Sequence, residues 1–318
     1  MMHELVAEVW RGDFLESVHH GTVAAVDADG RLVFGVGQPE ALAYPRSSNK
    51  PFQALAMVRN GLGLDGELLA LACASHSGEP FHIEGVRRIL AGAGLTEDAL
   101  QCTADLPLGE AAMADLLAAG GRRAPVYMNC SGKHAAMLAT CVANGWSTED
   151  YLDVDHPLQL AARAALEDLS GERVGSIGVD GCGAPLFAIS LTGLARAFGR
   201  LAAASAGTHE RRVADAMSRH PEWVGGTGRD VTDLMRGLPG AVAKDGAEGV
   251  YAIGLPDGSA VAVKIADGST RARPVVLVAA LRRLGVDVDA VAEVADVPVL
   301  GHGQRVGELR PSFVMVAA

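Results

Sequence analysis

Alternating apolar and polar positions predict strands at both ends of the chain. The first 40 residues contain VAEVW, SVHHGTVAAVD and RLVFGVG, and Asp29-Gly30 supplies the residue types of a tight hairpin turn. Residues 250–268 alternate around Pro256-Asp257-Gly258 and predict a second hairpin, and residues 312–318 (SFVMVAA) predict a closing strand. A β-meander therefore opens the chain, and further strands close it.

Between Pro51 and about Arg236 the periodicity becomes helical and Ala/Leu-rich. Most of these segments stop at a glycine, and residues 186–204 (LFAISLTGLARAFGRLAAA) belong to the predicted helices. A further helix is expected over 274–285 (PVVLVAALRRLG).

The simplest packing joins the terminal strands in one largely antiparallel sheet, with the helices as a second layer and a helical subdomain. We therefore expect an α/β (α+β) fold. Its sheet-containing domain is discontinuous, over residues 1–50 and 240–318, and 51–239 form a mainly helical region with the site at the junction.

Charge and composition limit the classes of molecule that the protein is expected to bind. The 318 residues carry 27 Lys+Arg against 38 Asp+Glu, a net charge of -11, and no run has more than two consecutive basic residues. Nucleic acids and anionic membranes are held by clustered Lys and Arg, so neither is an expected partner. Two glycine-rich stretches, Gly35-Val36-Gly37 and Gly225–Gly228, match neither nucleotide-binding fingerprint. We expect a small-molecule ligand.

The sequence also predicts a cytoplasmic location. There is no signal-peptide pattern at the N-terminus and no run of about 20 apolar residues. Five cysteines without tight spacing argue against a disulfide framework and leave free thiols or metal ligands as their roles.

The strongest chemical signal is a Ser-x-x-Lys pattern where the first strands end. Ser47 and Lys50 are one helical turn apart, which puts a hydroxyl and an amine on the same face. A lysine can activate a serine nucleophile only when its surroundings favour the neutral amine, so the site must be partly dry. The alternative is that Ser47 caps a helix and Lys50 is solvated on its first turn.

A second lysine strengthens the catalytic interpretation. Lys264 lies within an alternating apolar strand, where a lysine is unexpected unless it faces a polar site or an edge. Penicillin-recognising serine hydrolases combine Ser-x-x-Lys on a helix with Lys-[Thr/Ser]-Gly on a facing strand. The Ser-Asp-Asn element of those enzymes is absent, and Lys264-Ile265-Ala266 departs from Lys-Thr-Gly, so a true β-lactamase is not favoured.

Three loops carry further reactive groups. Residues 73–79 (CASHSGE) contain Ser75, and residues 129–134 (NCSGKH) contain Cys130 and His134. Residues 178–185 (GVDGCGAP) add Asp180 and Cys182. Two cysteines in glycine-flanked loops suggest zinc, although two thiolates do not complete a tetrahedral site. Ordered loop residues and helix caps are the alternative interpretation.

Taken in order, RSSNKPFQAL, CASHSGEP, MNCSGKHAAML, VDGCGAP and KDGAEGVYAIGL resemble the rhizobial-type L-asparaginases, often labelled asparaginase II. The resemblance spans nearly the whole chain. It implies a fold similar to serine β-lactamases and glutaminases, a homodimer, and hydrolysis of L-asparagine to L-aspartate and ammonia. It also implies two Ser-Lys tandems, Ser47 with Lys50 and Ser75 with Lys264, and a zinc site of Cys130, Lys133 and Cys182. Asn49 inside the first tandem departs from the small residue usual there and leaves the Ser-Lys spacing intact.

We therefore expect an amidohydrolase that forms a covalent intermediate. Lys50, kept neutral by Lys264, would deprotonate Ser47, and Ser75 and Lys264 would relay protons. Arg46 would pair with the substrate carboxylate and Asp180 with its ammonium, and His134 is a further candidate for substrate binding. Glutaminase, β-lactamase-like activity and a non-catalytic binder of amino acids or metal are the alternatives.

Overall fold

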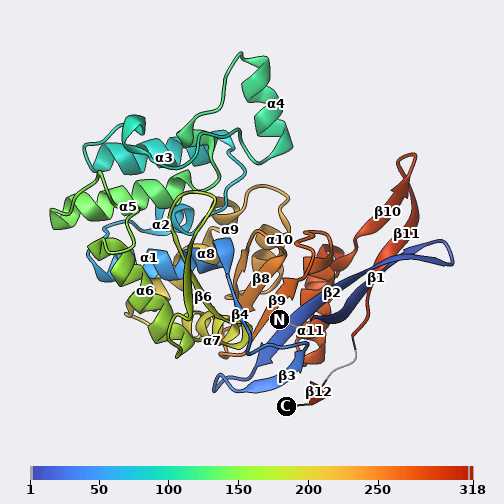
Figure 1. Ribbon diagram of the computed structural model, residues 1–318. Coiled ribbons are helices and arrows are strands. Elements are labelled where there is room, and N and C mark those ends of the chain that lie inside the picture. Colours follow the sequence, from blue (N-terminus) through green and yellow to red (C-terminus); the bar gives the residue numbers. More distant parts are fainter. Residues whose placement is uncertain (1–2, 314–315, 318) are drawn as a thin grey trace.

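The computed structural model describes residues 3–313 and 316–317. These residues form a nine-stranded sheet ordered β10-β11-β1-β2-β9-β8-β7, with β3 beside β2 and β12 beside β3. Figure 1 shows the blue N-terminal strands next to the red C-terminal strands, so the predicted joining of the chain ends is confirmed. The strands are β1 (Glu4–Arg11), β2 (Phe14–Val26), β3 (Leu32–Val36), β7 (Val242–Asp245), β8 (Val250–Gly254), β9 (Ala260–Ile265), β10 (Pro298–Gly301), β11 (Gln304–Pro311) and β12 (Val316–Ala317).

All pairings in this sheet are antiparallel, and both predicted hairpins form. β2 turns into β3 through residues 27–31, and β8 turns into β9 through residues 255–259. The closing strand is present over Val316–Ala317, which pair with Gly35 and Phe34 of β3. Residues 314, 315 and 318 of that predicted strand lie outside the described residues.

A second, three-stranded sheet corrects one predicted helix. It consists of β4 (Leu42–Ala43), β6 (Pro185–Ser190) and β5 (Ser176–Val179), in the order β4-β6-β5. The helix expected over residues 186–204 therefore begins only at Leu191, because Ser190 ends β6 and its Oγ accepts the Gly193 N–H at 2.8 Å. Continuous apolar character hid the change from strand to helix, since a buried strand has no polar face.

The middle of the chain is mainly helical, as expected, and Gly145 and Gly171 end two of its helices with left-handed φ of 65° and 72°. The α-helices are α1 (Lys50–Arg59), α2 (Gly66–Ala72), α3 (Pro80–Gly92), α4 (Glu110–Ala118), α5 (Ser131–Asn144), α6 (Pro157–Ser170), α7 (Leu191–Ala202), α8 (His209–Arg219), α9 (Pro221–Val224), α10 (Asp230–Gly237) and α11 (Ala272–Arg283). Short 3-10 helices are η1 (Arg46–Asn49), η2 (Glu97–Ala99), η3 (Pro125–Tyr127) and η4 (Asp289–Ala295). No helix in these described ranges is both long and apolar enough to cross a membrane.

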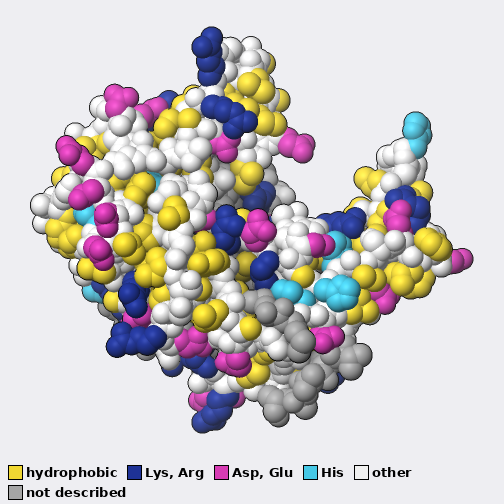
Figure 2. All heavy atoms as spheres, viewed as in Figure 1, with side chains coloured by type: hydrophobic (Ala, Val, Ile, Leu, Met, Phe, Trp, Pro, Cys, Tyr) yellow, Lys and Arg dark blue, Asp and Glu magenta, His cyan; other side chains and the backbone are white. Residues whose placement is uncertain are grey.

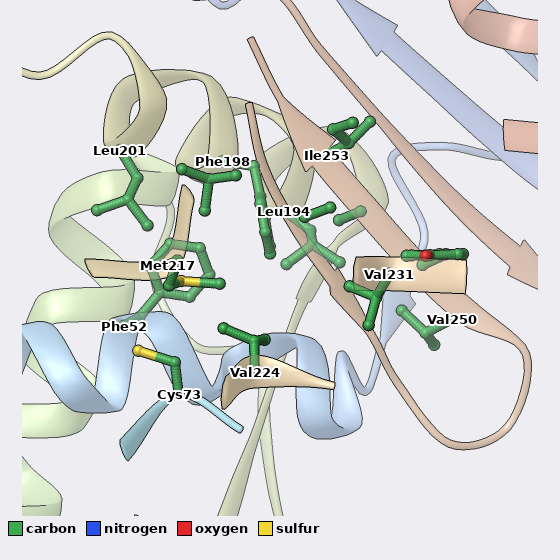
Figure 3. Packing of buried hydrophobic residues seen from close by; sticks show 14 of the residues in the cluster. Phe52, Cys73, Leu194, Phe198, Leu201, Met217, Val224, Val231, Val250 and Ile253 are labelled. Carbon is green, nitrogen blue, oxygen red and sulfur yellow. The ribbon is translucent and has the colours of Figure 1, made fainter. Parts of the chain in front are cut away.

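The core lies between the main sheet and the helices, and α1 runs through it. Lys50–Val58 of this helix are all buried, so α1 has no solvated face. Figure 3 shows Phe52 of α1 close to Phe198 of α7, with their rings edge to face and 5.3 Å between centroids. Ile253 and Val250 of β8 belong to the same buried cluster on the sheet side. A lysine at the start of such a helix is therefore placed in a dry environment.

The sheet continues beyond the core as an arm formed by the β1-β2 and β10-β11 hairpins (Figure 1). The β10-β11 hairpin was not predicted, because Gln304–Pro311 is mostly polar and gives no apolar alternation. Large apolar side chains are exposed along the arm, with Phe14 at 72% and Leu300 at 56%.

The division into a sheet domain and a helical region stays a prediction.

Candidate active site

The Ser-x-x-Lys turn lies where β4 ends and the helices begin. Arg46 has a φ of 51°, an uncommon value for a residue with a side chain, and the chain turns through it into η1. Pro45 caps η1 and Asn49 caps α1, both without a side-chain hydrogen bond, so Ser47 is not a helix cap. Ser48 Oγ donates to the carbonyl of Lys244 at 2.8 Å and fastens the turn to β7.

Lys50 is buried rather than solvated, with 1% of its surface exposed. Its Nζ donates to the Ala74 carbonyl at 2.6 Å and to Ser75 Oγ at 3.0 Å. The structure thus joins Lys50 to the second serine, whereas Ser47 Oγ has no hydrogen-bond partner among residues 3–313 and 316–317. Both serines are therefore related to the same amine. Ser75 is hydrogen-bonded to Lys50, and Ser47 lies three residues before Lys50 in the same turn.

The Ser75 segment is held between two loops. Ser75 N–H donates to Val224 O at 3.0 Å, His76 N–H to Asn129 O at 3.1 Å, and Ser77 N–H to Gly225 O at 2.9 Å. Successive amides thus point alternately to the loop after α9 and to the loop before α5. Each of these three buried N–H groups therefore has a carbonyl acceptor.

The histidines of the two predicted loops are buried and hydrogen-bonded. Ser131 Oγ donates to Val126 O at 2.8 Å, so its oxygen accepts the Nε2–H of His76 at 2.9 Å. His134 Nδ1 is 2.8 Å from the Tyr151 hydroxyl. The Nε2 of His134 is also buried; burial and then Lys133 lower the pKa of His134, and nearby Cys182 opposes this shift.

Lys244 is a further candidate site residue, which the sequence interpretation missed. It lies on β7, is fully buried, and donates from Nζ to its neighbour Asp245 through the carbonyl at 2.8 Å and through Oδ1. Burial lowers the pKa of Lys244 to about 8; Asp245 opposes this shift and nearby Lys50 adds to it. Lys244-Asp245-Gly246 has the Lys-x-Gly form sought at Lys264, and this signal was available in the sequence.

The distribution of lysines supports this assignment. The whole chain has four lysines among its 27 Lys+Arg, namely Lys50, Lys133, Lys244 and Lys264. The first three are buried, although lysine is normally a surface residue. Three of the four lysines are therefore enclosed by protein, and arginines supply most of the other cations.

The structure does not bring Lys264 to Ser75. Its Nζ donates to the carbonyls of Glu248 and Ile265, the latter at 2.8 Å. Burial lowers the pKa of Lys264, although Glu248 and Asp267 oppose the shift. In this position Lys264 fastens the turn between β7 and β8.

Arg46 and Asp180, predicted to bind opposite ends of an amino acid, bind each other. Arg46 Nε donates to Asp180 Oδ1 at 2.8 Å, and Arg46 Nη1 lies 3.7 Å from Glu248 Oε1. Both side chains of the shorter pair are partly accessible, at 23% and 14%. Figure 2 shows acidic and basic side chains side by side on the face between the helices and the arm.

The three predicted metal ligands come together in the interior. Lys133 Nζ lies 3.2 Å from Cys182 Sγ, and Cys130, whose Sγ donates to Asn129 Oδ1 at 3.1 Å, lies near the same thiol. Cys130, and then Lys133, hold the pKa of the Cys182 thiol far below its ordinary value, although burial opposes the shift. Among the described residues, no group of three or more His, Cys, Asp or Glu is arranged to hold a metal.

The sequence matches the family model described as L-asparaginase II over residues 7–311. The chain belongs to the L-asparaginase II family. Membership makes it an amidohydrolase enzyme, and no curated protein matches the sequence.

Several solved structures resemble this L-asparaginase II. A β-lactamase, Mb2281c from Mycobacterium bovis, is 17% identical, with 84% of this chain and 95% of that chain covered and a TM-score of 0.46. Mglu in its native form is 16% identical, with 83% and 63% covered and a TM-score of 0.44. A putative β-lactamase from Bacteroides dorei DSM 17855 is 15% identical, with 77% and 84% covered and a TM-score of 0.41.

The donor types that meet here, two thiols and one amine, agree in kind with the zinc ion that the sequence suggested. Two sulfur atoms and one amine nitrogen meet within the interior, and one sulfur already favours its thiolate form. The Lys133 amine is less suited to bind a metal. Burial lowers its pKa, but Cys182 and Cys130 raise it by a larger amount, so the amine keeps its proton. A metal bound there would have to displace that proton.

Proposed function

We propose that this L-asparaginase II hydrolyses L-asparagine to L-aspartate and ammonia through a serine acyl-enzyme. The observation that carries the proposal is the Lys50 amine, buried at the start of α1 and hydrogen-bonded to Ser75 Oγ at 3.0 Å. It lies one helical turn from Ser47, whose hydroxyl has no partner in the described residues. A buried amine one helical turn from a serine hydroxyl can act as the base that activates this serine.

In the first step, Lys50 accepts the proton of Ser47 Oγ while this oxygen attacks the side-chain amide carbon of asparagine. The Ser47 N–H lies in the first turn of η1, where it has no acceptor within the helix, and would stabilise the developing oxyanion. The proton then passes from Lys50 through Ser75 Oγ to the amide nitrogen, and the C–N bond breaks to release ammonia. Water hydrolyses the ester by the same route in reverse.

Lys244 is the second lysine that the geometry favours. A neutral Lys244 makes it easier for Lys50 to accept the proton of Ser47, because two cations in a buried site repel one another. The role of Lys264 as the relay partner of Ser75 stays a prediction, and its amine is bound to two carbonyls. The substrate contact of His134 also stays a prediction.

The Arg46–Asp180 pair supports an α-amino acid as the substrate. An α-amino acid carries one carboxylate and one ammonium, so it can replace the ion pair with two new ones and leave the charge balance unchanged. Arg46 would then bind the α-carboxylate and Asp180 the α-ammonium.

Arg46→Met should raise KM for asparagine about 10- to 100-fold with a smaller change in kcat, because a charged hydrogen bond contributes about 1.5–3 kcal/mol. Steady-state kinetics measures both constants. Arg31→Met is the matched control, since Arg31 forms an exposed pair with Asp29 at 2.7 Å away from the site. An equal loss in kcat with KM unchanged would remove Arg46 from substrate binding.

We further propose that zinc is held by Cys130, Lys133 and Cys182. When bound, it would act as a Lewis acid near Asp180 and hold the loops of residues 129–134 and 178–185 together. Removing it with a chelator should raise KM more than it lowers kcat and should leave the protein folded, since the large core does not depend on one ion.

Elemental analysis of protein purified without added metal measures the zinc content. Cys130→Ser should lose the metal, whereas Cys141→Ser, at a buried free cysteine of the same helix region, should keep it. Zinc below about a tenth of an equivalent in the unaltered protein, with no gain in activity on adding it, would contradict the proposal.

We propose a homodimer that uses the arm as its interface. Exposed Phe14, Leu15 and Leu300 supply apolar surface, and both charge signs alternate around them, which suits a self-complementary contact. Phe14→Glu with Leu300→Glu should convert a dimer to a monomer in analytical ultracentrifugation. Leu117→Glu, at an exposed leucine of α4, should not change the mass. A monomer before substitution would contradict the interface.

A cytoplasmic location is also proposed. It is supported by the five cysteines, all of which are buried and free, as expected in a reducing compartment.

The function is tested by offering purified protein three substrates in parallel: asparagine, glutamine and a β-lactam. Asparagine should release ammonia with the highest kcat/KM. Faster release from glutamine would change the substrate to glutamine, and β-lactam opening without ammonia from either amide would contradict the amidohydrolase mechanism at this site.

A further inference from the structure

A buried ion-pair network lies behind Lys244. The Asp245 carboxylate accepts from Lys244 through Oδ1 and from Arg229 Nη2 at 2.9 Å through Oδ2. Arg273 Nη2 lies 3.9 Å from the same Oδ2, and its Nη1 donates to the Gly246 carbonyl at 2.7 Å. The carboxylate is thus shared between the lysine of the site and two arginines.

Cations outnumber anions in this network. Lys244 is faced by Asp245 on its own strand, Lys50 from α1, Arg229 before α10, and the neutral thiol of Cys73 after α2. Asp245 is faced by Arg229, Arg273 and Lys244, with Asp230 of α10 and Tyr251 of β8 beside them. Four basic side chains therefore share two carboxylates in the interior. Adding a proton to Lys244 there is unfavourable, because each carboxylate is already engaged by an arginine.

Arg229 also connects this network with the Ser75 segment. It ends the loop of residues 225–229, and the Gly225 carbonyl in that loop accepts from both Ser77 N–H and Ser77 Oγ. Thr227 of the same loop donates from N–H and Oγ1 to Glu79. One loop therefore contacts Ser77, two residues after Ser75, and also supplies Arg229, which binds the carboxylate of Asp245.

We propose that Arg229 is a positioning residue that, by engaging Asp245, limits the hold of this carboxylate on the Lys244 ammonium and so favours the uncharged amine needed beside Lys50. The inference rests on the proposed function and goes beyond it, because it assigns control of the site's protonation to a side chain that touches neither serine.

The network predicts opposite effects for its two central residues. In Arg229→Met the Asp245 carboxylate turns more fully to Lys244, so the lysine keeps its proton to higher pH. In Asp245→Asn the lysine loses its anion and gives up its proton at lower pH. Since the neutral form is the active one, kcat/KM of the unaltered enzyme should rise with pH through about 8.

The test is the pH profile of kcat/KM for asparagine. Arg229→Met should move the midpoint up by about one pH unit, which lowers kcat/KM at pH 7 about tenfold while the alkaline plateau stays within about twofold. Arg229→Lys should restore most of the midpoint, and Asp245→Asn should move it down. Arg236→Met, at an exposed arginine of α10 paired with Glu222, is the control and should leave the profile unchanged. An equal loss at every pH with a fixed midpoint would overturn the proposal.

A second readout does not need turnover. With four lysines in the chain, selective ¹³C labelling of lysine gives few signals, and the Lys244 signal is assigned by its absence in Lys244→Arg. Its titration midpoint should rise in Arg229→Met. If the unaltered protein released no ammonia, the proposed function would fail while this titration still decided the role of Arg229. An unmoved Lys244 midpoint would overturn the inference even in an active enzyme.

Discussion

Replacing Ser47 by alanine should lower kcat by about three orders of magnitude, the loss expected when a covalent nucleophile is removed. The fold should survive, because the Ser47 side chain makes no hydrogen bond with described residues and its loss should cost less than about 1 kcal/mol. Steady-state ammonia release measures the rate, and urea denaturation measures the free energy of unfolding.

Ser75→Ala is the informative comparison for this variant. It removes the hydroxyl that Lys50 binds at 3.0 Å but leaves Ser47 and Lys50 in place. A proton relay is worth about two to four orders of magnitude, but a residual covalent intermediate should still form. Near-normal turnover by folded Ser47→Ala, with no turnover by Ser75→Ala, would move the nucleophile to Ser75.

Lys50→Met should lower kcat by about two to four orders of magnitude, because it removes the general base of both half-reactions. Methionine has a similar length and suits the buried environment. Loss of the hydrogen bonds to Ala74 and Ser75 is destabilising by about 1–3 kcal/mol for each unsatisfied buried group, partly offset by removing a buried amine.

Lys264→Met is the matched control for Lys50→Met. Lys264 lies in β9, and its amine donates to two backbone carbonyls and to neither serine. It should retain activity within about tenfold if its role is to fasten the β7–β8 turn. Loss of activity as large as that of Lys50→Met would instead support the relay predicted from the resemblance.

Local patterns predicted much of the fold. Alternation identified both hairpins, and a glycine stop identified the end of α5. The β6 strand was missed because Pro185–Ser190 is apolar on both faces, and the β10-β11 hairpin was missed because its exposed residues are mostly polar. In both cases tertiary contacts, rather than the local pattern, decide the structure.

The sequence predicted some residues of the candidate site but not the contacts between them. Spacing along one helical turn pointed to Ser47 and Lys50, but the pairing of Lys50 with Ser75 depends on contacts between residues 25 positions apart. The choice between Lys244 and Lys264 depended on strand order, since both lie in apolar strands. β7 is at the edge of the sheet nearest the Ser-x-x-Lys turn, whereas Lys264 of β9 lies opposite Val250 and Thr22. Sequence periodicity gives the faces of a strand and not its neighbours.

The covalent serine mechanism is tested most directly by mass spectrometry of the intact protein quenched during turnover of asparagine. We expect a population heavier by the mass of asparagine less ammonia, and peptide mapping should locate the added group on Ser47, with none in Ser47→Ala. Full ammonia release without any such species at the shortest quench times, or an added group on Ser75, would contradict the account.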